Sequence, residues 1–239
     1  VATANSLGAD AIVLLGDYKA GFRMPHRVLR DREWTSELAR LRAPLGVHAV
    51  LGNHDWWEDL AAQKAGRGPV RIRRSLENAG LPVYENDAVR LTKNGRPFWL
   101  AGLADQWAIW WGRDRQARSR RFDYLGMHDL ARTLAHVTDD APVILLAHEP
   151  DIFPEVPERV ALTLCGHTHG GQVNLLGYRP FVPSRFGDRY AHGHIVEKRE
   201  TADAALPGRH LIVSSGLGCS GAPVRFGAPP EIVQVDIGA

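Results

Sequence analysis

The chain has 239 residues, of which 44% are hydrophobic and 23% are charged, and its formal net charge is +2. This length and composition fit one large globular domain, with or without a cap. The charge is too small to indicate nucleic acid as a partner. No stretch is apolar for long enough to span a bilayer, and no signal peptide is visible.

The predicted elements alternate between helix and strand early in the chain, and strands predominate late. We expect helices at 1–9, 32–41, 60–65, 72–79 and 124–137. We expect strands at 11–15, 47–51, 83–91, 98–103, 142–147, 161–165, 194–198, 210–215 and 231–237. Continuous apolar runs such as AIVLL (11–15) are typical of buried central strands. The pattern predicts an α/β fold, a four-layer αββα sandwich of two mixed β-sheets flanked by helices.

The chain is interpreted as one domain over residues 1–239, with residues 105–124 as a candidate cap segment. The chain has two cysteines, Cys165 and Cys219, too few for a disulfide scaffold. Both lie near predicted strand ends, where a single bridge is conceivable, although disulfides are rare in reducing compartments.

Four short polar motifs each follow a predicted apolar strand. They are Gly16-Asp17, Gly52-Asn53-His54-Asp55, Ala147-His148-Glu149 and Gly166-His167-Thr168-His169-Gly170-Gly171. Ligand sites in open α/β sheets lie just beyond the carboxyl ends of strands, so all four motifs are expected to converge on one crevice. Each motif alone is more often a turn, a cap or a structural histidine, and the prediction rests on their joint occurrence in this order.

The residue types in these motifs suit a centre with two metal ions. Asp17 can bridge two cations with its two oxygens, and Asn53 offers a neutral oxygen. His148, His167 and His169 offer imidazole nitrogens, and the last two alternate along an extended segment, so they can point to the same side. Mixed oxygen and nitrogen ligands favour Mn, Fe, Zn or Co over Ca.

The order of the motifs resembles the calcineurin-like metallophosphoesterase superfamily. Segments 142–151 (PVILLAHEPD), 165–173 (CGHTHGGQV) and 214–232 are similar to a narrower bacterial branch of membrane-associated phosphoesterases, which includes UDP-2,3-diacylglucosamine pyrophosphatases. The family's first motif, Asp-x-His, does not occur in this sequence. Because the chain opens within the helix that follows that motif in the family, we expect the chain to be truncated at its N-terminus.

The resemblance implies two divalent or trivalent metal ions, of Mn, Fe, Zn, Mg or Co. By this likeness Asp17 would bridge both ions. Asn53, His148 and His167 would bind one ion, and His169 would bind the other. The missing Asp-x-His would supply two further ligands to the ion that His169 binds.

The resemblance also assigns two residues to catalysis. His54 would act near the leaving-group or phosphoryl oxygens, as an acid or a charge stabiliser. Asp55 would orient His54 through a hydrogen bond and fix its tautomer. The implied reaction is hydrolysis by a metal-bridging hydroxide that attacks phosphorus in line with the leaving group.

The implied function is hydrolysis of a phosphomonoester, phosphodiester or pyrophosphate bond, with a lipid-linked substrate as one option. One alternative is a catalytically silent protein of the same fold that binds a partner. Another is a hydrolase of a different bond, such as a zinc amidohydrolase or a metallo-β-lactamase. The β-lactamase kind carries a His-x-His-x-Asp-His run that is absent from this sequence.

The segment 106–121 has an unusual composition, in which three tryptophans precede a run of arginines. Trp107, Trp110 and Trp111 stand beside the arginines of 113–121. The segment is either an ordinary packed loop or an amphipathic cap that meets lipid headgroups, because indole rings favour the membrane interface. Membrane contact is therefore one expectation, nucleic acid is not an expected partner, and oligomeric state is left open. The location is left open between membrane-associated and cytoplasmic in a bacterium.

Overall fold

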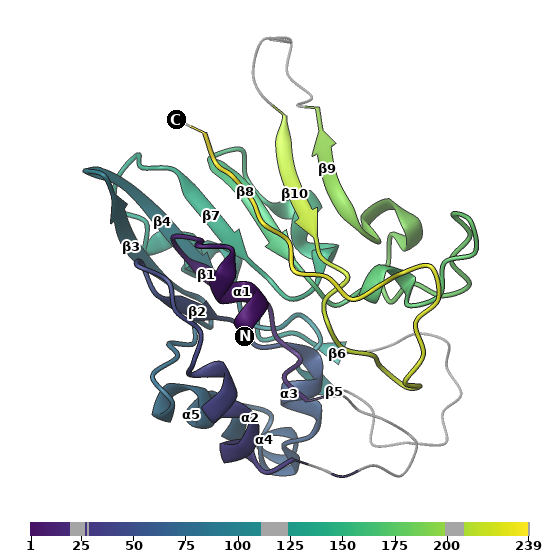
Figure 1. The fold of residues 1–239 in the computed structure, drawn as a ribbon. Coiled ribbons are helices and arrows are strands. Elements are labelled where there is room, and N and C mark those ends of the chain that lie inside the picture. Colours follow the sequence, from purple (N-terminus) through teal and green to yellow (C-terminus); the bar gives the residue numbers. More distant parts are fainter. Residues whose placement is uncertain (20–26, 28, 111–123, 199–207, 239) are drawn as a thin grey trace.

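The computed structural model describes residues 1–19, 27, 29–110, 124–198 and 208–238. A mixed six-stranded sheet runs through the described part of the chain (Figure 1). Its strands lie in the order β3 (Asp87–Lys93), β4 (Arg96–Gly102), β7 (Val143–Leu146), β8 (Val160–Cys165), β10 (Arg209–Val213) and β9 (Gly193–Glu197). The four inner strands are parallel, and the two edge strands are antiparallel to their neighbours.

Two smaller ribbons accompany this sheet. The parallel strands β1 (Ile12–Leu14) and β2 (Val47–Ala49) form one, and Ala49 makes a further parallel bridge to Val83. The antiparallel strands β5 (Ile109–Trp110) and β6 (Tyr124–Leu125) form the other. Each predicted strand from 11–15 to 161–165 has a counterpart in these sheets. The strand predicted at 83–91 begins only at Asp87.

The helices are short. The α-helices are α1 (Ala2–Ser6), α2 (Asp31–Leu38), α3 (Asn53–Trp57), α4 (Leu60–Ala65), α5 (Arg71–Asn78) and α6 (Leu130–Ala135), and the 3-10 helices are η1 (Pro150–Glu155), η2 (His169–Gly171) and η3 (Gly187–Tyr190). The helix predicted at 124–137 is α6 alone, because residues 124–125 belong to β6. No helix among the described residues is both long and apolar enough to cross a bilayer.

Alternate residues of the central strands pack into different apolar layers, as the two-residue period of a strand requires. Val50, Leu100 and Leu146 pack with partly buried residues of β1 between the two sheets. Leu145 and its neighbours pack on the opposite face of the large sheet, with apolar residues of η1 and α6. The outer face of the β1–β2 ribbon packs against α2 to α5. The layers are therefore helix, sheet, sheet and helix, and the predicted α/β class is confirmed.

One predicted strand and one conceivable disulfide are not formed in the described residues. The apolar tail at 231–237 is predicted to be a strand, but it is assigned to none, because it makes no hydrogen-bonded ladder with another strand of the described chain. Cys165 and Cys219 are free thiols, so the conceivable bridge between them is not formed.

The burial of β7 predicts a strong dependence of stability on Leu145. Its side chain is fully buried in the central strand. Leu145→Ala should lower the free energy of unfolding by about 2–5 kcal/mol, through lost transfer energy and a residual cavity. Urea unfolding followed by circular dichroism measures this change. Leu60→Ala is the matched control, since Leu60 is 77% exposed, and an equal loss in both variants would contradict the assigned core.

Candidate metal centre

The loops that follow β1, β7 and β8 bring three predicted ligands together. A carboxylate oxygen of Asp17 and one ring nitrogen each of His148 and His167 all lie within 4.8 Å of one another. His148 Nε2 is 3.2 Å from Asp17 Oδ2, and the two imidazole centroids are 4.9 Å apart. Residues separated by more than 100 positions in the sequence therefore form one cluster at the carboxyl ends of parallel strands.

Several buried polar atoms in this region lack a hydrogen-bond partner among the described residues. They are Asn53 Oδ1, His148 Nε2 and both ring nitrogens of His167. Burying a polar atom without a partner costs free energy, so native proteins rarely leave such atoms in a group. Amide oxygens and imidazole nitrogens are also metal ligands. This donor set fits a bound transition-metal ion.

The hydrogen bond from His148 to the backbone fixes which nitrogen faces Asp17. His148 Nδ1 lies 2.5 Å from the Leu15 carbonyl oxygen, which can only accept, so Nδ1 carries a proton. In a neutral ring Nε2 is then the acceptor, and it faces a carboxylate oxygen of Asp17. Because both of these atoms are acceptors, a positive charge is needed between them. Burial acts to lower the pKa of His148, but Asp17 raises it to about 10. A bound cation can supply this positive charge.

The other two histidines are held in their neutral form. Burial lowers the pKa of His167 well below its ordinary value, and His148 lowers it further. Burial likewise lowers the pKa of His169 to about 4, against the opposing effect of Asp17. Neutral imidazole is the form that binds metal. His169 does not belong to the cluster within 4.8 Å. Among the described residues, Asp17, His148 and His167 therefore lie closer to one another than His169 lies to them.

The backbone of the site is strained where the ligand residues are. Asp17, His167 and His169 have φ angles of 58°, 66° and 54°, in the left-handed region that residues other than glycine rarely adopt. Such strain tends to occur at functional sites. Gly52 is required nearby, because a Cβ atom there would lie 2.4 Å from Asp17 Oδ1.

Asp55 connects the two loops that carry Asp17 and His54. Asp55 Oδ2 accepts hydrogen bonds from the amides of Gly52 and Asp17, each at 2.9 Å, and its Oδ1 accepts one from Tyr18 at 3.0 Å. Burial and the nearby Asp17 carboxylate raise the pKa of Asp55 to about 7. The expected hydrogen bond between the Asp55 carboxylate and the His54 ring is not found among the described residues, where the carboxylate accepts from three backbone amides instead.

His54 is oriented by other groups. Its amide donates to Asp17 Oδ1 at 2.9 Å. Its ring packs edge-on against Trp57, with centroids 5.1 Å apart, and its Nε2 lies 3.3 Å from Ser220 Oγ. Ser220 lies in a loop rich in glycine and small residues, so no sequence signal could have identified this contact.

Trp107 and Asp105 belong to the interior of the site region. The Trp107 ring is buried and meets the His167 ring edge-on at 4.7 Å, so it is not the surface anchor that was one interpretation of the 105–124 segment. Asp105 is fully buried beside Glu149. Burial is the larger cause and the Glu149 carboxylate the smaller one that raise the pKa of Asp105 well above its usual value. Trp111 and the arginines of 113–121 lie outside the described residues.

Other histidines of the described chain do not belong to the three-residue cluster. His192 Nε2 binds the Glu231 carboxylate at 3.0 Å, and His194 Nε2 lies 2.9 Å from His210 Nδ1. His48 is buried and contacts the Tyr84 hydroxyl at 3.0 Å.

Residues 2–196 match the family model of the calcineurin-like phosphoesterases. A metallophosphoesterase of Aquifex aeolicus is 32% identical over 203 residues, which are 84% of this chain and 64% of that protein. The metallophosphoesterase YkuE of Bacillus subtilis is 30% identical over 234 residues, which are 97% of this chain and 69% of that protein. The phosphodiesterase YaeI of Escherichia coli is 29% identical over 232 residues, which are 95% of this chain and 70% of that protein.

No solved structure gives a significant match to the chain. The family match covers far more than half of the chain, and the two more similar of these relatives carry the word metallophosphoesterase in their names. The buried cluster of oxygen and nitrogen donors agrees with that description. The chain therefore belongs to the calcineurin-like phosphoesterase family.

Proposed function

We propose that the protein is a metal-dependent phosphoesterase whose centre binds two metal ions. The observation that carries this proposal is the buried cluster of Asp17, His148 and His167, whose ligand atoms lie within 4.8 Å and partly lack hydrogen-bond partners in the described chain. Asn53 and His169 complete the proposed ligand set, with Asp17 shared between the ions. Manganese, iron, zinc, magnesium and cobalt are the candidate ions, because the donors combine oxygen and nitrogen.

When bound, such ions lower the pKa of a water molecule and neutralise charge on phosphate oxygens. The chain's own residues hold the reacting groups in position and supply protons around these ions. His54 stands at the N-terminus of α3, where its amide is held by Asp17 and its ring by Trp57 and Ser220. Its imidazole can donate a proton to a leaving-group oxygen or stabilise negative charge there. Asp55 acts in this proposal by holding the Asp17 loop against α3.

The substrate in this proposal is a phosphate ester, and its bond type is a monoester, a diester or a pyrophosphate. The name of the YaeI relative, a phosphodiesterase, favours the diester. Metal-dependent rates with p-nitrophenyl phosphate, bis-p-nitrophenyl phosphate and a lipid-linked nucleotide diphosphate sugar would rank the three bond types. Absence of turnover on all three, with metal bound, would instead support a catalytically silent binding protein.

A lipid surface is the partner that we propose beside this site. Two loops that follow His169 and β10 expose six large apolar side chains, called here the apolar rim: Leu176, Tyr178, Phe181, Leu217, Val224 and Phe226. A hydrogen bond of 2.7 Å from the Asn174 amide to the Phe226 carbonyl joins the two loops. Residues 172–187 and 215–230 contain three arginines and no carboxylate side chain.

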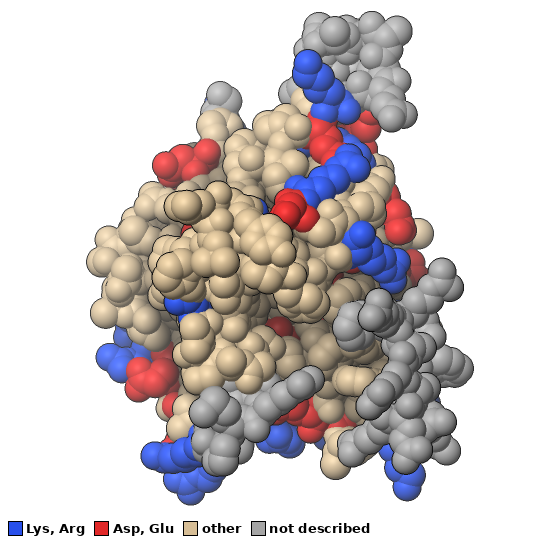
Figure 2. Space-filling view, turned by 90° about the vertical axis from the view of Figure 1, so that its right-hand side faces the viewer, with Lys and Arg blue, Asp and Glu red and all other residues tan. Residues whose placement is uncertain are grey.

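The charge pattern supports a bilayer with anionic headgroups as that partner. Figure 2 shows the side of the molecule on which these loops lie, and the charged side chains stand mostly at its margins. Exposed apolar side chains accompanied by arginines favour an anionic lipid interface. A phosphate ester carried by a lipid would then reach the metal centre without leaving the bilayer.

Removing the Asp17 carboxylate should strongly weaken metal binding. Asp17→Asn is expected to weaken Mn²⁺ binding by more than about 100-fold, because even indirect partners of a ligand contribute 10–100-fold. In the unaltered protein, Mn²⁺ at 100 times its Kd should stabilise the fold by about 2.7 kcal/mol, and EDTA should reverse this. Calorimetry measures both effects. The exposed Asp140→Asn variant is the control, and equal Mn²⁺ affinity in both variants would remove Asp17 from the ligand set.

Removing the His54 imidazole should separate catalysis from metal binding. His54→Ala is expected to keep the bound metal but to lower kcat by about 10²–10⁴-fold, the usual contribution of a positioned acid or base. Metal content by mass spectrometry and turnover of the best substrate of the panel give the two readouts. His136→Ala, at an exposed position of the described chain, should retain normal turnover. Near-normal turnover of His54→Ala would exclude His54 from the reaction.

The apolar rim predicts binding to vesicles. Sedimentation with phosphatidylcholine vesicles that contain phosphatidylglycerol should retain the protein, and Leu176→Ser combined with Phe181→Ser should weaken retention by more than about tenfold, since each buried apolar side chain contributes about 1.5–3 kcal/mol. Leu60→Ser, on α4, is the exposed control. Failure of the unaltered protein to bind, or equal binding by the double variant, would contradict the lipid proposal.

A further inference from the structure

Four aromatic side chains of α3 and the β5–β6 ribbon pack against one another. They are Trp57 at the end of α3, Trp107 just before β5, Trp110 in β5 and Tyr124 in β6, called here the aromatic platform. Tyr124 stacks on Trp57 and on Trp107, in each case with ring centroids 5.0 Å apart. Trp110 meets the rings of Trp57 and Tyr124 edge-on, at 5.4 and 5.7 Å. These separations and orientations are those of favourable aromatic pairs.

The aromatic platform touches two residues of the candidate site and extends from them to solvent. The Trp57 ring meets the His54 ring edge-on, with centroids 5.1 Å apart. The Trp107 ring, only 8% exposed, meets the His167 ring at 4.7 Å. Trp110 is 55% exposed. The platform is therefore a continuous aromatic surface that begins at the proposed proton donor and ends in water.

Hydrogen bonds hold the aromatic platform in place. Trp57 Nε1 donates to the Trp107 carbonyl at 2.7 Å. Gln63 Nε2 donates to the Ala108 carbonyl at 2.7 Å, and Gln63 Oε1 accepts from the Trp110 amide at 3.0 Å. These bonds join the start of the β5–β6 ribbon to α3 and α4. A surface that is already ordered loses little conformational freedom when a ligand binds to it.

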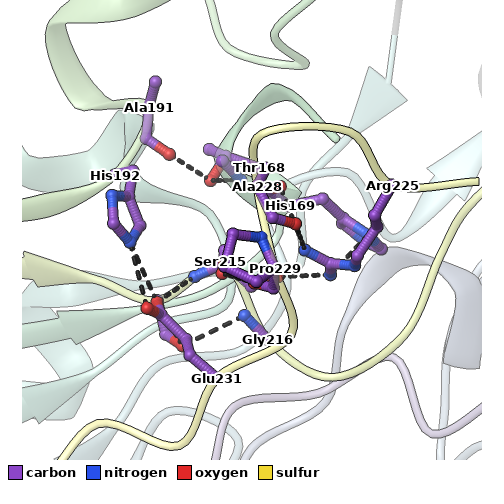
Figure 3. A network of polar contacts seen from close by, with 12 residues as sticks. Thr168, His169, Ala191, His192, Ser215, Gly216, Arg225, Ala228, Pro229 and Glu231 are labelled. Atoms are coloured by element: carbon purple, nitrogen blue, oxygen red, sulfur yellow. Dashed lines mark hydrogen bonds and ion pairs between the residues drawn. The ribbon is translucent and has the colours of Figure 1, made fainter. Parts of the chain in front are cut away.

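The His54 ring has a polar neighbour as well, in the loop that follows β10. Ser220 Oγ lies 3.3 Å from His54 Nε2. The Glu231 carboxylate accepts from the Ser215 amide at 2.7 Å, and Arg225 Nη2 donates to the Ser215 carbonyl at 2.6 Å (Figure 3). Because these bonds hold the loop closed at its base, we take the aromatic platform as the side of His54 that receives a ligand.

We propose that the aromatic platform binds the leaving group of the substrate, and that this leaving group carries a planar aromatic ring. The phosphoryl group lies at the metal centre with the leaving oxygen beside His54, and the ring packs against Trp57 and Trp110. Trp110 is then a specificity-determining residue. Aromatic pairs contribute free energy beyond the area that they bury, so a planar ring is favoured over an aliphatic group of similar size.

This inference rests on the proposed phosphoesterase function, from which it takes the position of the phosphoryl group and the role of His54. It adds the chemical class of the leaving group, which the metal ligands do not determine.

Two phosphonates that differ only in their ring test the proposal without turnover. Benzylphosphonate and cyclohexylmethylphosphonate carry a methylene group in place of the leaving oxygen, so neither is a phosphate ester. Calorimetry with the Zn²⁺-loaded full chain should show about 2–10-fold tighter binding of benzylphosphonate, the scale of one aromatic pair. Trp110→Ala should remove most of this preference, and Trp110→Phe should retain part of it.

The control is Leu125→Ala, at a 43% exposed position of the same ribbon, which should keep the full preference for benzylphosphonate. The proposal is overturned if the unaltered protein binds both phosphonates equally, or if a folded Trp110→Ala protein keeps the full preference.

The division of the effect between KM and kcat gives a second readout. With bis-p-nitrophenyl phosphate, Trp110→Ala should raise KM about 2–10-fold and leave kcat nearly unchanged. Contact between the rings is the same in the bound substrate and in the transition state, so its loss weakens binding of both equally. A lower kcat at unchanged KM would contradict the assigned role.

The outcomes distinguish this inference from the two earlier proposals. Turnover without a preference for benzylphosphonate would overturn this inference alone. A preference for benzylphosphonate without turnover would support the aromatic platform and count against the phosphoesterase proposal. If Trp110→Ala weakens retention on the phosphatidylglycerol vesicles but keeps the preference for benzylphosphonate, Trp110 is a membrane contact and this inference is wrong.

Discussion

The geometry of the site depends on the Asp55 carboxylate and the three backbone amides that it accepts. Two of these amides belong to the loop after β1 and one to the turn before α3, so a single buried group joins segments that are 38 residues apart. Hydrogen bonds to a charged acceptor are stronger than neutral ones, particularly where water is excluded. Through them Asp17 is placed so that one oxygen accepts from the His54 amide and the other faces His148.

The cluster of unpaired acceptors follows from this arrangement together with the parallel strands. Strands β7 and β8 lie side by side, so the residues that follow them emerge next to each other, and His148 and His167 meet Asp17 there. The left-handed backbone angles at Asp17 and His167 are the local cost of aiming those side chains inward. The stable packing of the sheets holds this unfavourable geometry in place, and a bound cation would offset the mutual repulsion of the ligand atoms.

Much of this could be predicted from the sequence, because the relevant signals are local. The apolar runs at 11–15, 47–51, 142–147 and 161–165 predict buried strands, and the polar residues directly after them identify Asp17, His148 and His167. The partners of Asp55 could not be predicted, since backbone amides leave no trace in a sequence. The tail at 231–237 has strand propensity but makes no ladder with another strand of the described chain, and propensity alone does not form a sheet. Ser220 stands among glycines and prolines, where no periodicity indicates a fold.

The contact between Ser220 and His54 has a consequence for the order in which the protein folds. It spans 166 residues, so it can form only after the ribosome has added Ser220. The strands β1 to β8 can pair before that point, since domains fold as their parts emerge. During synthesis the Asp17, His148 and His167 cluster can therefore assemble before the His54 ring gains its contact with Ser220.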